Sequence, residues 1–205
     1  MEKGGEGFDN IAGMVGWENI IMSTLNTPAN KRFEGMTVQD IAKARGTDPV
    51  DCVCDMLIEE NCAITMIDFI TCEEDIARIL NCGFASVISD SIYPASGRPH
   101  PRLYGTYARI IQRFVGERRD MTLEAAVKAM TYTPAKALNI ADRGLLREGL
   151  CADVNVFDPA EVKERGSYAD PDKCAAGMDY VFVNGKPAIA AGELTGGAFG
   201  QVIRR

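Results

Sequence analysis

No long hydrophobic run interrupts this 205-residue sequence, and none approaches the roughly 18 residues that a membrane-spanning helix needs. The N-terminal stretch MEKGGEGFDN lacks the basic and then apolar order of a secretory signal. A surplus of basic residues is also missing, because the formal net charge is −7 and lysine and arginine are scattered rather than clustered. We therefore expect a cytoplasmic protein that binds neither a membrane nor a nucleic acid.

The sequence also lacks a C-x-x-C motif, although it has seven cysteines, an odd number for a disulfide framework. Cys52, Cys62, Cys72 and Cys82 recur every ten residues with Cys54 beside the first, so a zinc or redox module is the alternative to weigh. On a helix Cys52 and Cys54 would lie about 200° apart and could not bind one ion. We expect reduced thiols, most of them small core residues.

Apolar residues make up 46% of the chain and charged residues 25%, which is ordinary for a globular protein with one good core. A capping-box pattern at residues 37–40 predicts a short helix that ends at Gly46. Asp48 followed by Pro49 predicts the start of a second helix, which runs to about Glu60. By contrast, the first 36 residues are rich in glycine and weakly periodic, and we expect them to be irregular.

A strand, a helix and a second strand are predicted next. Residues 63–69 and 84–89 have the composition of strands, and a capping box at Thr71 begins a helix between them. This order within about 30 residues is typical of a βαβ unit with a parallel sheet. Asp90 then follows the second strand at the edge where such sheets place reactive groups. Its carboxylate is a candidate metal ligand or base toward a bound water, and a turn or helix-cap role is the alternative.

The loop after Asp90 contains PHPRLYGTY, which brings the single histidine, His100, close in sequence to Arg102 and Tyr104. Prolines on both sides of His100 stiffen the loop and reduce the entropy lost on binding, and Arg102 can hold a carboxylate through two parallel hydrogen bonds. These groups suggest a binding site. A surface loop whose arginine makes an internal salt bridge is the alternative.

Further helices are predicted after this loop. The apolar spacing from Tyr107 to Phe114 indicates one helix. Thr122 is predicted to cap LEAAVKAM, and Thr133 before Pro134 to cap AKALNI.

Beyond residue 141 the pattern changes to short strands and tight turns. Asn184 and Gly185 between apolar runs predict a hairpin with a type I′ turn, because this pair accepts positive φ angles. We expect a small β module over residues 142–205, with a domain boundary near Ala141.

Three segments carry a family resemblance. They are SDSIYPASGRPHPRLYGTYARII, MTLEAAVKAMTYTPAKALNIADRGLLREGLCADVNVFDP and YVFVNGKPAIAAGELTG. In this order they resemble the C-terminal portion of N-acyl-D-amino-acid deacylases (D-aminoacylases) of the amidohydrolase superfamily. The Pro-His-Pro-Arg loop narrows the resemblance to that family, and the likeness covers nearly the whole chain.

The resemblance implies an α/β fold. Residues 1–141 would be the C-terminal part of a (β/α)8 metal-dependent hydrolase barrel, its last strands and helices with an inserted helical segment, and residues 142–205 would be strands of a small β-sandwich. It also implies zinc as the cofactor and hydrolysis of the amide of a small-molecule substrate, an N-acyl-D-amino acid.

The resemblance assigns roles to four residues. Asp90 matches the residue that approaches the metal and takes a proton from the hydrolytic water. Arg102 matches the arginine that receives the α-carboxylate of the substrate. His100 and Tyr104 are expected to stiffen the loop or to contact the substrate.

Three features depart from the family pattern. Ser91 stands where the family's Ser-Asp-Gly has glycine. The chain has no H-x-H pair, and the cysteine and further histidines of the family's zinc site lie on earlier strands; since a catalytic zinc needs about three protein ligands, we expect His100 and Asp90 not to hold it alone. The last strands of a barrel would also leave an open sheet edge, which favours association.

The leading hypothesis is therefore the C-terminal segment of a zinc-dependent N-acyl-D-amino-acid hydrolase, which is incomplete as an isolated chain because most of the family's zinc ligands are absent from it. One alternative is a non-catalytic companion that completes a barrel with a separate N-terminal polypeptide, or that self-associates. Another is a hydrolase of cyclic or other linear amides.

Overall fold

The computed structural model describes residues 9–93 and 97–203, so part of the predicted Pro-rich loop and the first residues of the predicted irregular entry lie outside it. The chain divides into two compact units. Unit 1 comprises Met1–Cys72, Ser91–Leu103 and Ser167–Asp172, and unit 2 comprises Glu73–Asp90, Tyr104–Gly166 and Lys173–Arg205. Each unit is thus built from segments that are distant in the sequence.

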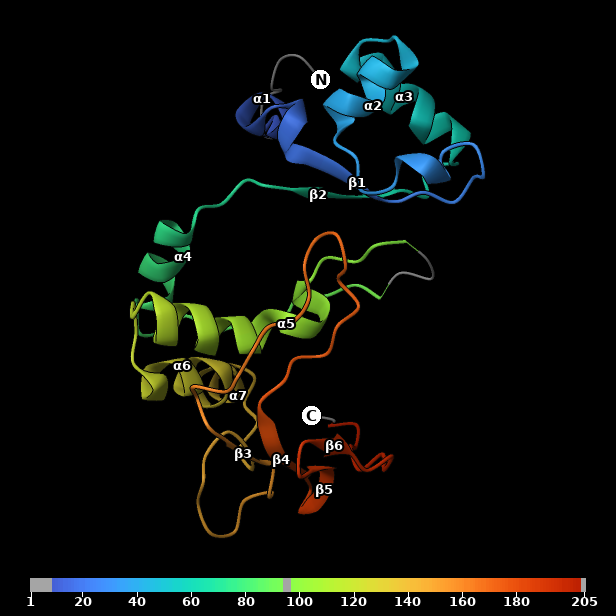
Figure 1. The fold of residues 1–205 in the computed structure, drawn as a ribbon. Helices are drawn as coiled ribbons and strands as arrows, with labels where there is room; N and C mark the ends of the chain where they lie inside the picture. The colour runs from blue at the N-terminus through green and yellow to red at the C-terminus, as the bar shows by residue number, and fades with distance from the viewer. Residues whose placement is uncertain (1–8, 94–96, 204–205) are drawn as a thin grey trace. The chain divides into compact units, whose positions relative to one another are not determined.

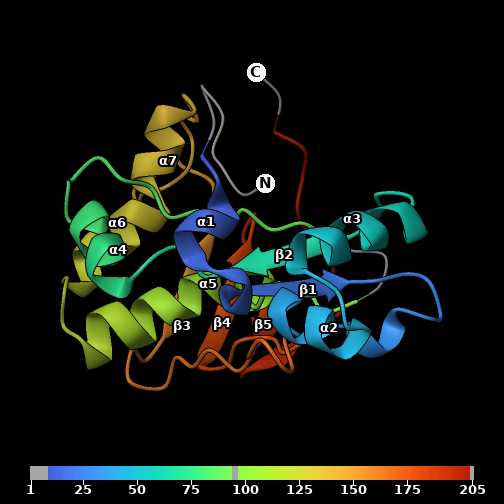
Figure 2. The same ribbon diagram turned by 90° about the horizontal axis from the view of Figure 1, so that it is seen from above.

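Unit 1 contains a two-stranded sheet and short helices (Figures 1 and 2). Its elements are, in chain order, α1 (Ile11–Val15), η1 (Trp17–Asn19), β1 (Ile20–Thr24), η2 (Lys31–Phe33), α2 (Val38–Arg45), α3 (Pro49–Glu59) and β2 (Thr65–Asp68). β1 and β2 run antiparallel, with Ile20 opposite Asp68. The prediction of a strand within residues 63–69 is confirmed, whereas the prediction that the first 36 residues are irregular is wrong, because β1 lies there.

Side-chain caps begin the two longer helices of unit 1. The Thr37 side chain accepts a hydrogen bond from the Asp40 backbone N–H at 3.1 Å, and Asp48 accepts one from the Val50 N–H at 2.8 Å. Gly46 ends α2 in the left-handed conformation (φ 69°), which glycine adopts without a Cβ clash. The predictions of α2 and α3 are confirmed, and both depend on contacts that are local in sequence.

The core of unit 1 forms where β1, α2 and α3 lie against one another (Figure 2). Its buried residues are Ile20, Met22, Leu25, Phe33, Val38, Ile41, Ala42, Cys52 and Met56. α2 and α3 are therefore amphipathic helices that pack their apolar faces into the core beside β1.

All seven cysteines are free thiols, as predicted. Only Cys52 is buried, and the exposed ones are Cys54, Cys62, Cys72, Cys82 and Cys174. The expectation that most cysteines are core residues is therefore wrong. On α3, Cys52 and Cys54 point to different sides, because residues two positions apart on a helix are rotated by about 200°.

The carboxylate of Glu60 organises the loop that follows β1. It accepts hydrogen bonds from the backbone N–H of Asn26 at 2.6 Å, from that of Thr27 at 3.1 Å, and from the amide of Asn30 at 2.9 Å. Glu60 is only 3% exposed. Burial by itself would raise its pKa, but the hydrogen bonds together favour the charged form and lower the pKa to about 2.

Unit 2 contains helices followed by a four-stranded antiparallel sheet (Figure 1). The helices are α4 (Glu73–Leu80), α5 (Arg102–Arg109), the π-helix η3 (Ile110–Glu117), α6 (Leu123–Met130) and α7 (Tyr132–Ala137), and the first two residues of α5 are counted in unit 1. The strands are β3 (Val154–Phe157), β4 (Met178–Val183), β5 (Lys186–Ala190) and β6 (Glu193–Leu194), paired in chain order. α4 is confirmed as a helix, although it begins two residues after the predicted cap at Thr71.

The helix predicted from Tyr107 to Phe114 is formed by α5 and η3. Its inner face buries Ile110, Ile111 and Phe114, while Tyr107 is 46% exposed. These inner residues belong to two clusters that also take in residues of α4, α6 and Val162. No helix of residues 9–93 and 97–203 is long and apolar enough to span a membrane.

The threonine caps of the last helices have different outcomes. Thr122 caps α6 as predicted, since its side chain accepts a hydrogen bond from the Ala125 N–H at 3.2 Å. The predicted cap at Thr133 is wrong, because Thr133 lies inside α7. The helix starts earlier because the Ala135 N–H already reaches the Thr131 carbonyl at 3.1 Å.

The hairpin between β4 and β5 is confirmed. Asn184 (φ 49°) and Gly185 (φ 76°) form its two-residue turn, and both carry the positive φ angles that a type I′ turn requires. The predicted boundary near Ala141 stays a prediction.

Residues 84–89 do not form a strand, so the predicted parallel βαβ unit is wrong. Within the part of the chain that the structure describes, every paired strand is antiparallel to its neighbour. The Val87 N–H instead donates to the carbonyl of Ala129 at 2.9 Å, and Phe84 and Ile88 are 81% and 64% exposed. A strand needs a second strand to accept its backbone hydrogen bonds, and this segment has none beside it.

We predict that Glu60→Gln flattens the acid dependence of stability. The folded pKa of about 2 lies below the ordinary value of about 4.3, so the ionised contacts stabilise the fold fully above that ordinary value and are lost as the pH falls toward 2. Denaturant titrations should show the free energy of unfolding of the unaltered chain falling between about pH 5 and pH 2. The variant should be less stable at pH 7 and change less with pH.

Glu193→Gln, which alters an exposed carboxylate on β6, is the control. If it flattened the profile as much as Glu60→Gln, the assignment to Glu60 would be wrong.

Candidate functional site

Asp90 lies in unit 2 at the end of the irregular segment 84–89 and is exposed. Its backbone is left-handed, with φ 45°. Few residues other than glycine adopt this conformation, and aspartate is among those that tolerate it best. The left-handed turn thus falls on Asp90 itself, one residue before Ser91, which stands at the family's glycine position.

His100 is half-buried in unit 1 and holds the start of α5. Its Nδ1 accepts a hydrogen bond from the backbone N–H of Arg102 at 3.0 Å, and its carbonyl accepts one from the Leu103 N–H at 3.0 Å. Both donors belong to the first turn of a helix, where backbone N–H groups have no partner within the helix. His100 therefore acts as a side-chain cap.

Arg102 and Tyr104 are helical residues of α5, so the prediction that they lie on a loop is wrong. Both are half-buried. Because they are two residues apart on a helix, their side chains leave it about 200° from each other. The cap by His100 explains the early start of the helix, and no sequence rule predicts a cap by a histidine between two prolines.

The structure joins two of the four predicted site residues through a hydrogen bond. His100 and Arg102 are joined by the hydrogen bond at the start of α5 and lie in unit 1, whereas Asp90 and Tyr104 are counted in unit 2. The sequence proximity of His100 and Arg102 thus corresponds to a direct contact.

Tyr168 is a neighbour of His100 that sequence reasoning missed. Its hydroxyl lies 3.5 Å from His100 Nε2, and the two rings meet edge to face with centroids 5.2 Å apart. Phe69 contacts the Tyr168 ring at 4.8 Å, again edge to face. An aromatic residue inside the polar stretch ERGSYADPDKC was the available signal, but sequence gives no means of pairing it with a histidine 68 residues away.

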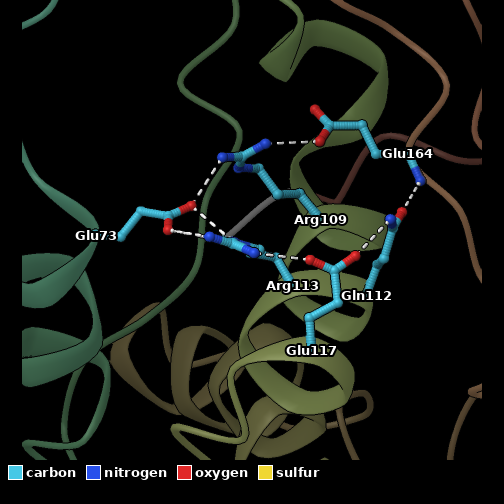
Figure 3. A pocket seen from close by; sticks show the side chains of 6 residues that line it. All are labelled: Glu73, Arg109, Gln112, Arg113, Glu117 and Glu164. Atoms are coloured by element: carbon cyan, nitrogen blue, oxygen red, sulfur yellow. Dashed lines mark hydrogen bonds and ion pairs between the residues drawn. The ribbon is translucent and has the colours of Figure 1, made fainter.

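A second polar cluster surrounds Glu73 in unit 2 (Figure 3). Arg113 donates to Glu73 at 2.8 Å, Arg109 at 3.1 Å and Arg118 at 3.3 Å. The same side chains border a hollow of about 290 Å³. Its lining residues are Glu73, Arg109, Gln112, Arg113, Glu117 and Glu164.

The charges of this cluster are already matched. Hydrogen bonds from Arg113 are the main reason that the pKa of Glu73 is lowered, and those same bonds raise the pKa of Arg113. Arg113 also donates to Glu117 at 2.9 Å, and Arg109 to Glu164 at 2.9 Å. A carboxylate held in its charged form by three guanidinium groups is a poor proton donor near neutral pH, so we assign the cluster to fastening α4 to α5 and η3.

The donor groups of the described residues do not form a complete metal site. Among residues 9–93 and 97–203, no three side chains of His, Cys, Asp or Glu lie together in a way that could hold an ion. A catalytic zinc takes about three protein ligands. The described donor set therefore does not fit a complete zinc site.

We predict that Glu73→Gln lowers the free energy of unfolding by about 1–2 kcal/mol, because it leaves three guanidinium groups around a neutral, partly exposed amide. Denaturant titration measures the difference in free energy of unfolding between the variant and the unaltered chain. Added salt should reduce this difference, because it screens the ion pairs. Glu117→Gln is the matched control, since Glu117 also pairs with Arg113 but from the next helical turn. An equal loss in both variants would show that Glu73 is not the centre of the cluster.

Comparison with known proteins places the chain in a family. A model of the "Amidohydrolase family" matches residues 27–189. An N-acyl-D-glutamate deacylase of Alcaligenes xylosoxydans xylosoxydans is 37% identical over 165 residues, which cover 80% of this chain and 32% of that protein. A D-aminoacylase of the same organism is 35% identical over 173 residues, covering 84% and 34%. The chain thus spans about a third of the length of these curated relatives.

Solved structures agree with this placement. A crystal structure of D-aminoacylase matches with a TM-score of 0.81 and 32% identity over 91% of this chain and 38% of that one. The N-acyl-D-glutamate deacylase from Bordetella bronchiseptica, complexed with zinc and a phosphonate inhibitor that mimics the tetrahedral intermediate, matches with a TM-score of 0.82 and 33% identity over 96% and 40%. The α/β fold and the resemblance to D-aminoacylases are confirmed. This chain belongs to the amidohydrolase family.

Proposed function

We propose that this chain is the C-terminal segment of a zinc-dependent amidohydrolase that cleaves the amide bond of N-acyl-D-amino acids. The observation that carries the proposal is the fixed start of α5, where His100 holds the backbone of Arg102. The relatives named as deacylases of N-acyl-D-glutamate and of D-amino acids support the substrate class.

Arg102 is proposed to receive the α-carboxylate of the substrate. It is the first residue of α5, so its guanidinium charge and the partial positive charge of the helix N-terminus favour the same anion. A guanidinium group can also bind a carboxylate through two parallel hydrogen bonds. Tyr104 is proposed as a further substrate contact, and His100 as the residue that stiffens the start of the helix.

Asp90 is proposed to take the proton from the attacking water. As the water oxygen bonds to the acyl carbon, its proton passes to the Asp90 carboxylate, and the amine leaves with a proton when the C–N bond breaks. Asp90 is exposed and directly follows the segment 84–89. A role for Asp90 as a metal ligand stays a prediction.

The zinc ligands are proposed to come from outside these 205 residues, because the described donors do not fit a complete site. We further propose that residues 1–141, with their inserted helical segment, belong to the end of a (β/α)8 barrel, and residues 142–205 to a small β-sandwich. The exposed apolar side chains of Phe84 and Ile88 support this, since residues 84–89 would become a strand only beside a neighbour that this chain does not supply.

We keep two alternative functions. A non-catalytic companion would complete a barrel with a separate N-terminal polypeptide without contributing to chemistry. A hydrolase of cyclic or other linear amides would use Asp90 but would have no need of Arg102.

The purified chain should hold well below one zinc ion and release no amine from N-acetyl-D-glutamate. Mixing it with the N-terminal two thirds of the Alcaligenes N-acyl-D-glutamate deacylase should give zinc-dependent turnover, and the Asp90→Asn chain in the same mixture should give none. Elemental analysis and an amine-release assay measure the two quantities. Stoichiometric zinc with turnover by the chain alone would contradict the proposal, and turnover by the Asp90→Asn mixture would favour the companion.

Replacing Arg102 should weaken binding of N-acetyl-D-glutamate by about tenfold to a hundredfold, because a charge-assisted bond to the α-carboxylate is lost. NMR titration of Arg102→Ala and Arg102→Lys gives the dissociation constants. Arg98→Ala, which removes an exposed arginine four residues earlier, is the matched control. Equal affinities for a ligand with and without the α-carboxylate would favour the hydrolase of other amides.

A further inference from the structure

The imidazole of His100 is held in one orientation by groups on both of its nitrogens. Nδ1 accepts the Arg102 backbone N–H, so the neutral ring carries its hydrogen on Nε2. That nitrogen faces the Tyr168 hydroxyl at 3.5 Å, the outer limit of a hydrogen bond. Rotation of the ring would move Nδ1 away from the helix it caps.

The ring of Tyr168 adds to this restraint. It meets His100 edge to face at 82° and is itself contacted by Phe69, so three rings from separate stretches of unit 1 form one row. Edge-to-face contacts of this kind have a preferred geometry, which restricts the orientation of the central ring. Tyr168 thus lies between Phe69 and the imidazole.

We propose that Tyr168 is a positioning residue for Arg102, acting through His100. By fixing the imidazole, Tyr168 keeps the Arg102 backbone N–H hydrogen-bonded to His100. The helix then begins at Arg102, and the direction in which the Arg102 side chain leaves the backbone is set. Its consequence for substrate recognition rests on the proposed function of Arg102 as the carboxylate receptor. The stretch 167–172, which belongs to unit 1 although it is far away in sequence, thereby contributes to carboxylate selectivity.

The test uses the full 205-residue chain and compares Tyr168→Ala, Tyr168→Phe and Tyr180→Ala. Tyr180 is the matched control, because it is 41% exposed, as against 42% for Tyr168, and stacks on Phe182 instead. Three quantities are measured by NMR: hydrogen exchange of the Arg102 amide, the nitrogen shifts of the imidazole, and the affinity for N-acetyl-D-glutamate. The imidazole signals are unambiguous because His100 is the only histidine.

In Tyr168→Ala the Arg102 amide should exchange about tenfold faster and the affinity for N-acetyl-D-glutamate should fall by a similar factor, because the cap opens more often. In Tyr168→Phe the amide exchange rate and the ligand affinity should stay close to those of the unaltered chain, since the ring is retained. In Tyr180→Ala neither quantity should change. Unchanged exchange in a folded Tyr168→Ala chain would overturn the proposal, as would an equal change in Tyr180→Ala.

If Tyr168→Ala fails to fold, Tyr168→Leu takes its place, because it removes the aromatic ring but keeps a large apolar side chain. Unchanged hydrogen exchange of the Arg102 amide in that variant would overturn the proposal. Ligand binding by the unaltered chain distinguishes a failure of this proposal from a failure of the proposed role of Arg102. If the unaltered chain shows no response to N-acetyl-D-glutamate, the role of Arg102 as carboxylate receptor fails, while the exchange rate of its amide still decides whether Tyr168 positions it.

Discussion

Backbone hydrogen bonding decides which apolar stretches of this chain become strands. The backbone groups of β1 and β2 are hydrogen-bonded to each other, and those of β3 to β6 form a continuous antiparallel ladder. Residues 84–89 have an equally suitable composition but lack a partner strand, and the Val87 N–H is satisfied by a carbonyl at the end of a helix. The same requirement acts at the start of α5, where the side chain of His100 replaces the missing helical partner of Arg102. Pairing of backbone groups thus shapes both the fold and the candidate site.

Each unit contains a carboxylate that several donors hold in its ionised form. Glu60 collects backbone and side-chain donors of the loop after β1, and Glu73 collects guanidinium groups from three arginines. Both have lowered pKa values, because the charged form accepts more hydrogen bonds than the neutral acid. They differ in what they fasten: Glu60 orders an irregular segment, whereas Glu73 joins helices. Neither is suited to proton transfer near neutral pH.

The proposed recognition of a carboxylate depends on a chain of contacts rather than on Arg102 alone. Phe69, Tyr168 and His100 come from three separate stretches of unit 1, and each contacts the next residue in a series that ends at Arg102. Positioning of this kind lowers the entropy that is lost when a ligand is bound. It also explains how a short polar stretch near residue 168 can affect a residue at the start of α5.

The sequence by itself determined the features that depend on neighbours a few residues away. The caps at Thr37, Asp48 and Thr122 and the Asn184-Gly185 turn are such features, because their donors and acceptors lie within four residues of each other. The family was also predictable, since its motifs occur in order along the chain. Tertiary structure alone decided that β1 pairs with β2, that residues 84–89 do not form a strand, that Cys54 is exposed, and that Tyr168 meets His100. The physical reason is that these outcomes depend on hydrogen bonds and packing contacts with residues that are distant in sequence. The local spacing of residues does not predict such contacts.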